Sequence, residues 1–230
     1  MGENLKKIAV VIGANGNLGK AVCRYLKKNN FIIDPVWQTN NRPNVTNDLA
    51  FSNLPKKIHT AIYIAGVNKI LPFENFSKED FYDVINVNLI SAVNFFKSAF
   101  PSLKRAKSSS CIVISSIMVN HPYPGRAPYA ISKSGLETLM KCLCIEWSKY
   151  GISTHAIRLG HLSKLMKSSK TNINLLDSVK NMTPRKKLIS VNEVAKYIVF
   201  LSSGGCSSVS GSVTEMDSGY TINRWPLKNN

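Results

Sequence analysis

The stretch Gly13-Ala14-Asn15-Gly16-Asn17-Leu18-Gly19 decides the fold of this chain. It follows an apolar run at residues 8–12 and opens an amphipathic segment, so it predicts a strand, a tight turn and the start of a helix. Such a turn binds the pyrophosphate of a dinucleotide through backbone N–H groups and the positive end of the helix. We expect Gly13 to permit the turn, Gly16 to admit phosphate, and Gly19 to let helix and strand pack closely. An ordinary strand-to-helix turn is the alternative.

Apolar strand candidates alternate with helical segments along the chain, which is typical of a parallel sheet covered on both faces. Strands are expected at residues 8–12, 31–37, 59–64, 111–115, 153–157 and 213–216, and helices at 18–29, 78–104, 128–150 and 191–201. Repeats, low-complexity tracts and linkers are absent from the sequence. The pattern predicts an α/β fold with a Rossmann-like, doubly wound parallel sheet in three layers, as one domain over residues 1–230.

Two segments fit neither class of element. Residues 38–57 are polar and rich in turn formers, where many dinucleotide-binding folds place another helix and strand. Residues 162–187 are polar and basic between two recognisable elements, and we expect them to form a mobile substrate lid.

The formal net charge is +17, from 30 Lys and Arg against 13 Asp and Glu. Such an excess is compatible with nucleic-acid binding, with an anionic cofactor or substrate, or with a Lys- and Asn-rich sequence bias. The lysines are spread along the chain rather than gathered in one block with aromatic residues between them. We therefore expect anionic small molecules as ligands and no nucleic acid.

Composition also bears on compartment and metal binding. No run approaches the roughly 18 apolar residues of a membrane helix, and the first residues lead into a strand without a secretory signal, so we expect a cytoplasmic protein that binds no membrane. The five cysteines form no Cys-x-x-Cys pair, and we interpret them as small buried hydrophobic residues in a reducing compartment. The four histidines show no metal-ligand spacing, so no metal site is predicted.

Tyr129-Ala-Ile-Ser-Lys133 places a phenol and an ammonium four residues apart, on one face of a predicted helix. A tyrosine with its ordinary pKa near 10 exchanges a proton slowly at neutral pH, and a neighbouring lysine is expected to lower that pKa. Upstream, a buried strand ends in Ser115 and Ser116, at the sheet edge where ligands bind in open α/β folds. The pattern suggests hydride transfer with a tyrosine as the proton donor.

These residues and the glycine turn resemble the short-chain dehydrogenase/reductase family over nearly the whole chain. The family's Tyr-x-x-x-Lys matches Tyr129 and Lys133, and its serine, thirteen residues before the tyrosine, matches Ser116 rather than Ser115. Its Asn-Leu pair on the preceding helix matches Asn88-Leu89 better than Asn86. The resemblance implies that Tyr129 is the general acid or base, Ser116 polarises the carbonyl, Lys133 tunes Tyr129 and holds the ribose, and Asn88 holds a relay water.

The expected cofactor is NADP, with NAD as the alternative, because no carboxylate stands at the end of the second predicted strand, where NAD-dependent enzymes bind the ribose. Asp34 lies within that predicted strand, too early to reach the ribose, whereas Arg42 is either a partner for a 2′-phosphate or a solvated loop residue. The residues predicted to bind the cofactor are Gly13, Asn15, Gly16, Asn17, Leu18, Gly19, Gln38, Arg42, Asn44, Val45, Ala65, Gly66, Tyr129, Lys133 and Gly160.

Several positions depart from the family pattern and leave the cofactor pose open. The glycines are spaced GxxGxxG, Tyr63-Ile64 replaces an Asn-Asn pair before Ala65-Gly66, Asn44-Val45 replaces Asp-Val, and Leu159 replaces the proline before Gly160.

The substrate is expected to contact Ser116, Met118, His121, Tyr123, Tyr129, Arg158 and His161. Arg158 and His161 suggest an anionic group on the substrate, although His121 and His161 are equally well interpreted as solvent-facing loop residues. A small carbonyl or alcohol substrate, anionic or carrier-bound, fits these features. The resemblance also implies a homodimer or homotetramer built on the 78–104 and 128–150 helices. A catalytically modified, nucleotide-binding or regulatory member of the family is the alternative function.

Overall fold

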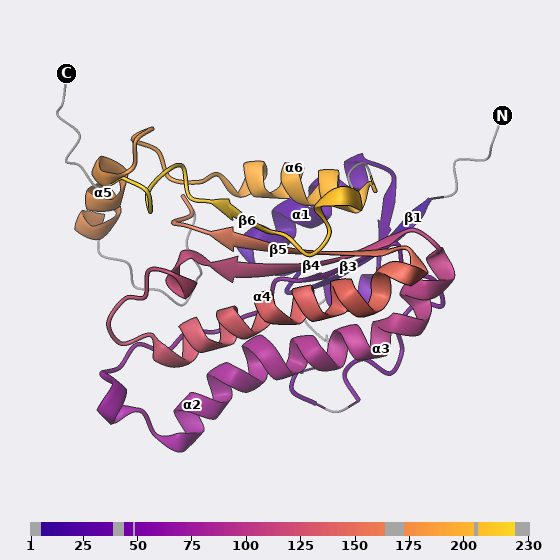
Figure 1. Cartoon of the computed structure of the whole chain (residues 1–230), viewed down its shortest axis with the longest axis horizontal. Coiled ribbons are helices and arrows are strands. Elements are labelled where there is room, and N and C mark those ends of the chain that lie inside the picture. Colours follow the sequence, from indigo (N-terminus) through magenta and orange to yellow (C-terminus); the bar gives the residue numbers. More distant parts are fainter. Residues whose placement is uncertain (1–5, 39–43, 48, 164–172, 205–206, 224–230) are drawn as a thin grey trace.

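Six parallel strands form one sheet at the centre of the molecule (Figure 1). The computed structural model describes residues 6–38, 44–47, 49–163, 173–204 and 207–223. The strands are β1 (Lys7–Ile12), β2 (Phe31–Ile33), β3 (Thr60–Tyr63), β4 (Ser109–Ser116), β5 (Ile152–Leu159) and β6 (Val213–Met216). They lie in the order β2-β1-β3-β4-β5-β6 with every neighbouring pair parallel, which confirms the doubly wound, Rossmann-like sheet.

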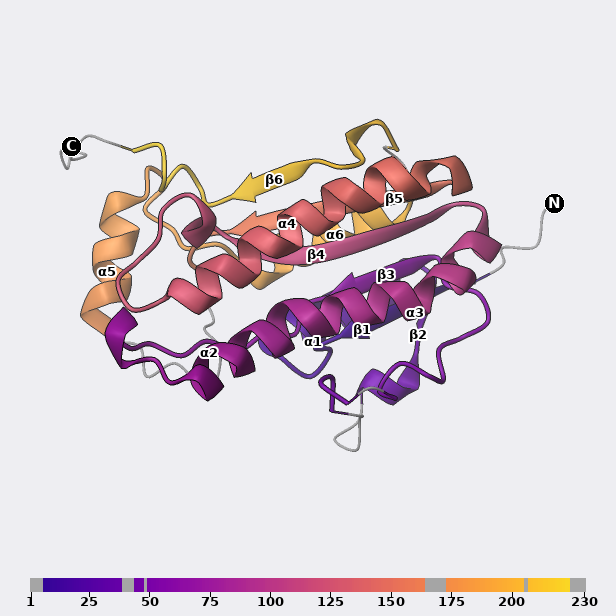
Figure 2. The same cartoon turned by 60° about the horizontal axis from the view of Figure 1, so that its bottom comes forward.

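Helices cover both faces of the sheet, which confirms the three layers. The helices are α1 (Asn17–Lys28), α2 (Lys78–Ile85), α3 (Ser91–Ala106), α4 (Ala127–Trp147), α5 (Ile173–Met182) and α6 (Val191–Ser202). In Figures 1 and 2, α1 and α6 lie on one face of the sheet, whereas α3 and α4 run side by side on the other.

The alternation of side chains along β1 explains why both faces are covered. Ala9 and Val11 belong to the hydrophobic cluster under α1 and α6, and Val10 and Ile12 to the cluster under α3 and α4. All four side chains are fully buried. A strand with no polar face cannot lie against water, so the sequence of β1 requires a helix layer on each side.

The strand order reverses at β1, which has β2 on one side and β3 on the other. Ligands of open α/β sheets bind outside the carboxyl ends of the strands at such a reversal. The same edge receives the polar ends of β4 and β5. The topology therefore brings the glycine turn, the serines of β4 and the start of α4 to one edge of the sheet.

The second strand is shorter than predicted. The expectation of a strand over residues 31–37 is wrong, because β2 ends at Ile33 and a 3₁₀ turn, Pro35–Gln38, follows. The Asp34 carboxylate accepts a hydrogen bond from Val36 N at 2.9 Å, which begins the turn, and proline has no N–H to continue the ladder. Trp37 is buried and stacks on Phe51 instead of extending the sheet.

The helix predicted over residues 78–104 is divided into three parts. α2 is capped by Ser77, whose Oγ accepts from Asp80 N at 3.1 Å, as the sequence predicts. A π-helical segment, Asn86–Ile90, then leads into α3. Single π-turns occur frequently at functional sites, and this one carries Asn88.

The segment proposed as a lid contains a helix that the sequence did not reveal. α5 lies within residues 162–187, and residues 164–172 lie outside the described part of the chain. The two ends of the segment meet in a parallel bridge between Leu162 and Ile189, where Ser163 N donates to Ile189 O at 2.9 Å. Its mobility stays a prediction.

Residues 44–47 and 49–57 form turns, without a helix or strand in that described stretch. Cys23 and Cys111 are buried free thiols, as predicted, whereas Cys144 is half-buried and Cys142 is exposed, so the prediction of a buried residue is wrong for Cys142; Cys206 lies outside the described residues. Over the described ranges, none of the helices has both the length and the apolar character required to cross a membrane.

Candidate active site

The glycine turn packs directly against the end of β3. Gly13 has a φ of 93°, and a Cβ at this position would lie 2.7 Å from Ala65 N. A Cβ at Gly19 would lie 2.1 Å from Gly13 O, which explains the close approach of α1 to the turn. A Cβ at Gly16 would meet nothing closer than 3.5 Å, so this glycine borders open space. The turn and packing roles of Gly13 and Gly19 follow from these contacts.

The N-terminus of α1 suits a dinucleotide pyrophosphate. Gly16 is its N-cap and offers no side-chain cap, and the first turn contains no acidic residue. Backbone N–H groups at such an end donate to anions, and the helix dipole favours negative charge there. Leu18 is buried in the core, so its contribution to a cofactor site is its backbone. These features fit the phosphates of a nicotinamide dinucleotide.

One residue beyond Ala65, the chain meets the predicted catalytic residues. A Cβ at Gly66 would lie 3.2 Å from Asn88 Oδ1 and 3.6 Å from Lys133 Nζ. Gly66 therefore leaves room for both polar side chains. Gly13 packs on Ala65, and Lys133 lies beside the next residue, Gly66. The glycine turn and Lys133 therefore lie on either side of Ala65 and Gly66.

Asn88 is fully buried and links three elements. Its Oδ1 accepts from Val67 N at 2.8 Å, and its Nδ2 donates to Val67 O at 3.0 Å and to Ser132 Oγ at 3.0 Å. Asn86, the competing match, is exposed. The Asn88 amide thus joins the π-segment to the chain after β3 and to α4, and the relay-water role stays a prediction.

Tyr63 accounts for one departure from the family pattern. Its ring is fully buried, and its hydroxyl donates to Val87 O at 2.5 Å. The side chain that replaces the usual asparagine therefore ties β3 to the π-segment that carries Asn88.

Tyr129 and Ser116 lie side by side at the ends of α4 and β4. Burial raises the pKa of Tyr129, while a hydrogen bond with Ser116 and the positive charge of Arg126 lower it. The net pKa is raised, so in this arrangement burial outweighs the lowering that the sequence predicts from a neighbouring positive charge. Lys133 Nζ lies 5.5 Å from the centre of the Tyr129 ring and is directed to a backbone carbonyl instead.

Lys133 is held by Ile114 O, to which its ammonium donates at 2.8 Å. The side chain is buried, and desolvation lowers its pKa from 10.5 to about 8. A buried amine with one backbone partner is poised to change protonation within the working range of enzymes.

Arg158 does not serve the anionic site predicted for it. Its Nε and Nη2 donate to the two Glu137 oxygens at 2.9 and 2.7 Å, and Nη1 donates to Glu215 at 3.0 Å. Ser115 Oγ also donates to Glu137 Oε1, at 2.6 Å. Because these carboxylates already occupy the guanidinium fork, Arg158 fixes α4 to β4, β5 and β6.

An aromatic group stands at the same sheet edge. Tyr123 Oη lies 3.0 Å from His161 Nε2 and 2.8 Å from Tyr220 Oη. Burial lowers the pKa of His161, and so does the positive charge of Arg126. Both residues predicted here, Tyr123 and His161, are brought together, and Tyr220 joins them from beyond β6.

Sequence reasoning missed three residues of this edge. The sequence motifs do not single out Tyr220, which follows the last predicted strand, or Arg126, which lies three residues before Tyr129. Asn68 follows Val67, and its buried Oδ1 has no hydrogen-bond partner. The position of Arg126, between Ser116 and Tyr129, was the available signal.

The other predicted residues have varied surroundings. Met118 is half-buried and its N–H donates to Ser116 Oγ at 3.3 Å, whereas His121 is exposed. Asn44 is exposed and its Oδ1 accepts from Thr46, and Val45 packs on the core. Gly160 packs on Asp217, whose Cα would lie 3.0 Å from a Cβ there. Arg42 and the Gln38 side chain lie outside the description.

Comparison with known proteins decides the family. The family model described as enoyl-(acyl carrier protein) reductase matches residues 47–221. The chain belongs to the short-chain dehydrogenase/reductase family. The match includes the Tyr129 and Lys133 pair and both serines of β4, and the motif order read from the sequence is that of the family.

Similar proteins include several oxidoreductases. The uncharacterized oxidoreductase YxjF of Bacillus subtilis is 31% identical over a match that covers 68% of this chain and 65% of YxjF. The 3-oxoacyl-[acyl-carrier-protein] reductase FabG of Buchnera aphidicola is 28% identical over 94% of this chain and 98% of its own length. A solved gluconate 5-dehydrogenase of Burkholderia cenocepacia, in complex with NADP and tartrate, shares the fold with a TM-score of 0.83 at 20% identity, over 94% of this chain and 95% of that one.

Proposed function

We propose that this chain is an NADP(H)-dependent oxidoreductase that reduces a carbonyl group, or oxidises a secondary alcohol, on a small biosynthetic metabolite. One observation carries the proposal: the glycine turn packs on Ala65, and the next residue, Gly66, packs on Asn88 and Lys133. A dinucleotide held at the turn would therefore extend toward the residues that handle protons.

The side chains divide the work of carbonyl reduction. The cofactor, when bound, supplies the hydride. Tyr129 gives its phenolic proton to the carbonyl oxygen, and Ser116 donates a hydrogen bond to the same oxygen as negative charge develops. The Lys133 ammonium, 5.5 Å from the centre of the Tyr129 ring, stabilises the phenolate that remains. In the oxidation direction Tyr129 accepts the alcohol proton as a base.

The preference for NADP rests on the end of β2. Asp34 pairs through its backbone with Ala9, well before the glycine turn, and its carboxylate accepts from Val36 N. It is therefore engaged away from the place where an NAD ribose is bound. The NADP complex of the gluconate dehydrogenase agrees with this choice.

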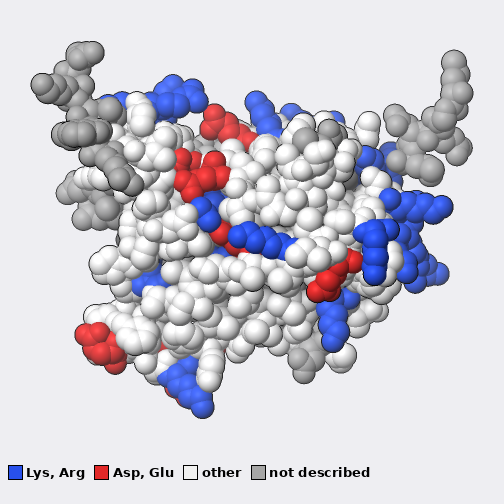
Figure 3. All heavy atoms as spheres, viewed as in Figure 1, with Lys and Arg blue, Asp and Glu red and all other residues white. Residues whose placement is uncertain are grey.

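Two substrate classes fit, a carrier-bound 3-oxoacyl group and a small anionic ketone. FabG supports the first and gluconate 5-dehydrogenase the second. On the face in Figure 3, the densest group of Lys and Arg lies at the end where the strands begin, away from the start of α4, so this face does not favour an acidic carrier at the site. Basic residues at that end also suit the helix C-termini that gather there.

The test is NADPH oxidation with a panel of ketones and keto acids. We expect turnover by the native chain and a loss of about 10²-fold or more in Tyr129→Phe, with NADPH binding retained. Lys141→Gln, an exposed change farther along α4, is the control. NADPH binding without any turnover would instead favour the nucleotide-binding or regulatory alternative.

Cofactor choice is tested separately by thermal shift. A ligand that binds only the folded state raises Tm, so NADPH should raise it more than NADH at equal concentration. A larger rise with NADH would reverse the assignment.

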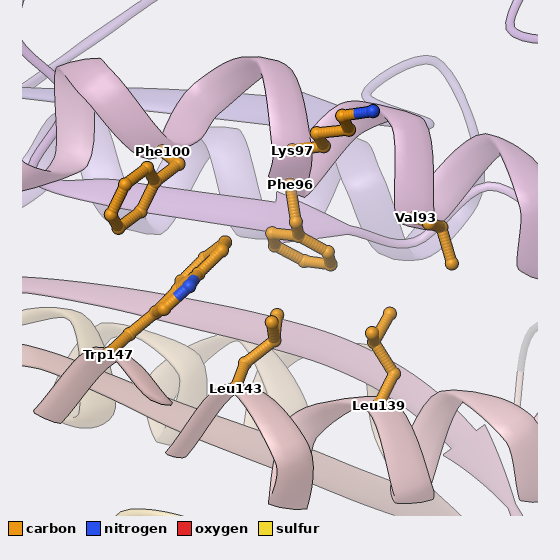
Figure 4. A pocket seen from close by; sticks show the side chains of 7 residues that line it. All are labelled: Val93, Phe96, Lys97, Phe100, Leu139, Leu143 and Trp147. Atoms are coloured by element: carbon orange, nitrogen blue, oxygen red, sulfur yellow. The ribbon is translucent and has the colours of Figure 1, made fainter. Parts of the chain in front are cut away.

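We also propose that the chain forms a homodimer through α3 and α4. An apolar groove of about 220 Å³ runs between them, lined by Val93, Phe96, Lys97, Phe100, Leu139, Leu143 and Trp147 (Figure 4). Ile145 on α4 is 85% exposed, and Ile90 beside α3 is 44% exposed. Light scattering after chromatography should give twice the chain mass, and Ile145→Lys should lower it; a monomeric native protein would exclude the dimer.

A further inference from the structure

Arg126 stands at the start of the helix that carries Tyr129. It is the N-cap residue of α4, and its carbonyl accepts from Ala130 N at 2.9 Å. On the other side, Gly125 O accepts from Leu71 N at 3.2 Å. The backbone on both sides of Arg126 is therefore fixed, so its side chain starts from a defined point three residues before the proton donor.

The surroundings of Arg126 place its charge among the aromatic side chains of the site. Arg126 caps α4 three residues before Tyr129, so the two side chains are neighbours across the first helical turn. Its positive charge also lowers the pKa of Tyr129, Tyr123 and His161, in agreement with that position. Tyr123 is in turn joined to His161 and Tyr220 by contacts of 3.0 and 2.8 Å. Arg126 therefore lies next to Tyr129 at the start of α4, at the sheet edge that also holds this hydroxyl-rich group.

The charge of Arg126 is not neutralised within the chain as described. The ion pairs in that part join Lys69 to Asp80, Arg158 to Glu137 and Glu215, and Lys180 to Asp177. Arg126 takes part in none of them and is half-buried. Arg158 has equal charge but is fully engaged, so the two arginines differ in what they can still bind.

We propose that Arg126 determines substrate specificity by binding an anionic oxyacid group, a carboxylate or a phosphate, on the carbonyl substrate. The inference rests on the proposed function and narrows it to small anionic ketones. A guanidinium pairs two N–H donors with two oxygens of such a group, which fixes orientation as well as charge. With its anionic group held there, the substrate would direct its ketone toward Tyr129. Tyr123 and His161 would contact the polar groups on the rest of the substrate.

The experiment compares each anionic ketone with a neutral partner of the same carbon skeleton. The pairs are 4-oxopentanoate with its methyl ester, and dihydroxyacetone phosphate with dihydroxyacetone. Each kcat/KM is measured for the native chain, Arg126→Gln and Arg126→Lys. Arg105→Gln is the control, because Arg105 is exposed near the end of α3, at the opposite sheet edge. The carboxylate and phosphate arms show which anion is preferred.

The ratio of anionic to neutral kcat/KM isolates recognition from chemistry. Loss of the Arg126 charge alters the Tyr129 pKa for every substrate, so that effect cancels in the ratio. We expect the native ratio to exceed one and to fall about tenfold or more in Arg126→Gln, less in Arg126→Lys, and not at all in Arg105→Gln. An unchanged ratio in Arg126→Gln would overturn the proposal, even in a fully active enzyme.

A binding measurement keeps the two proposals separable. If no ketone is reduced, the proposed function fails, and the role of Arg126 is then judged by thermal shift with NADPH at saturation and tartrate or inorganic phosphate titrated. A rise in Tm for the native chain and Arg105→Gln but not for Arg126→Gln supports anion binding at Arg126. Equal rises in all three, or none, contradict it.

Discussion

Two polar regions lie about two turns apart along α4, around Glu137 and around Tyr129, and they differ in whether their hydrogen bonds are complete. Around Glu137, both carboxylate oxygens accept from Arg158, and Ser115 donates to one of them. Around Tyr129, Ser116 and Arg126, polar groups keep donors and charge that no ion pair in the described part of the chain neutralises. The first region is a closed network that holds the helix, and the second has the open chemistry of a binding site.

The largest change in stability is expected from removing one partner of the Glu137–Arg158 ion pair. Glu137→Leu removes the main partner of a buried guanidinium and should cost about 3–5 kcal/mol, a fall in Tm of roughly 10 °C. Arg158→Met should cost a similar amount, because Glu137 is then buried without its partner. Urea unfolding of each variant measures the change.

The double variant Glu137→Leu with Arg158→Met supplies the control for that prediction. Two apolar side chains of similar size leave no buried charge at position 137 or 158, so its stability should lie closer to the native chain than either single variant. Additive losses would mean that the pair is not coupled.

Protonation of Lys133 should give the next largest effect. Its folded pKa of about 8 lies below the ordinary 10.5, so the unfolded chain binds more protons between these values. Stability should therefore rise with pH from about 8 to 10.5, by up to about 3 kcal/mol, and this contribution is lost as pH falls through 8. Lys133→Met should lack the rise, measured as the difference in unfolding free energy between the two proteins at pH 7.5, 9 and 10. Parallel curves would contradict a buried, shifted amine.

Two glycines of the turn differ in role: Gly13 supports the fold, and Gly16 borders the cofactor site. The changes in stability expected from substituting them are smaller than those above. Gly13→Ala forces a Cβ toward Ala65 N at a φ of 93°, and should cost on the order of 2 kcal/mol. Gly16→Ala enters open space at a φ of −71°, so stability should change by less than about 0.5 kcal/mol. The added methyl should instead weaken NADPH binding about tenfold, as measured by fluorescence titration. Loss of stability in Gly16→Ala with unchanged affinity would reverse the two roles.

The closed and open regions were unequally visible in the sequence. Periodicity and the glycine turn predict the sheet, its parallel order and most helices, because buried strands and amphipathic helices leave local patterns. Helical spacing also indicates Tyr129 and Lys133, and the family resemblance adds Ser116; the fold brings these residues together. These signals are local or have a fixed separation.

Long-range pairing left no such trace. The partners of Arg158 lie 21 and 57 residues away on α4 and β6, so the sequence could not show that its charge is already engaged. The end of β2 at Ile33 depends on a side-chain bond of Asp34, and the π-segment at Asn88 interrupts a regular helical pattern. The sequence does not reveal the role of Arg126, because that role depends on which arginine is left without an ion-pair partner in the fold.

The smallest predicted effect separates two adjacent serines. Ser115→Ala removes one hydrogen bond to the Glu137 carboxylate and should cost about 1–2 kcal/mol in unfolding free energy while leaving kcat nearly unchanged. Ser116→Ala removes the acceptor of the Met118 N–H and should cost about 1 kcal/mol, but it should lower kcat by about 10²-fold, because its hydroxyl is hydrogen-bonded with Tyr129. Paired unfolding and NADPH oxidation assays on both variants measure the contrast. Because successive residues of β4 point to opposite faces, the two losses should not overlap, and a Ser115→Ala enzyme as inactive as Ser116→Ala would show that the closed network itself takes part in the chemistry.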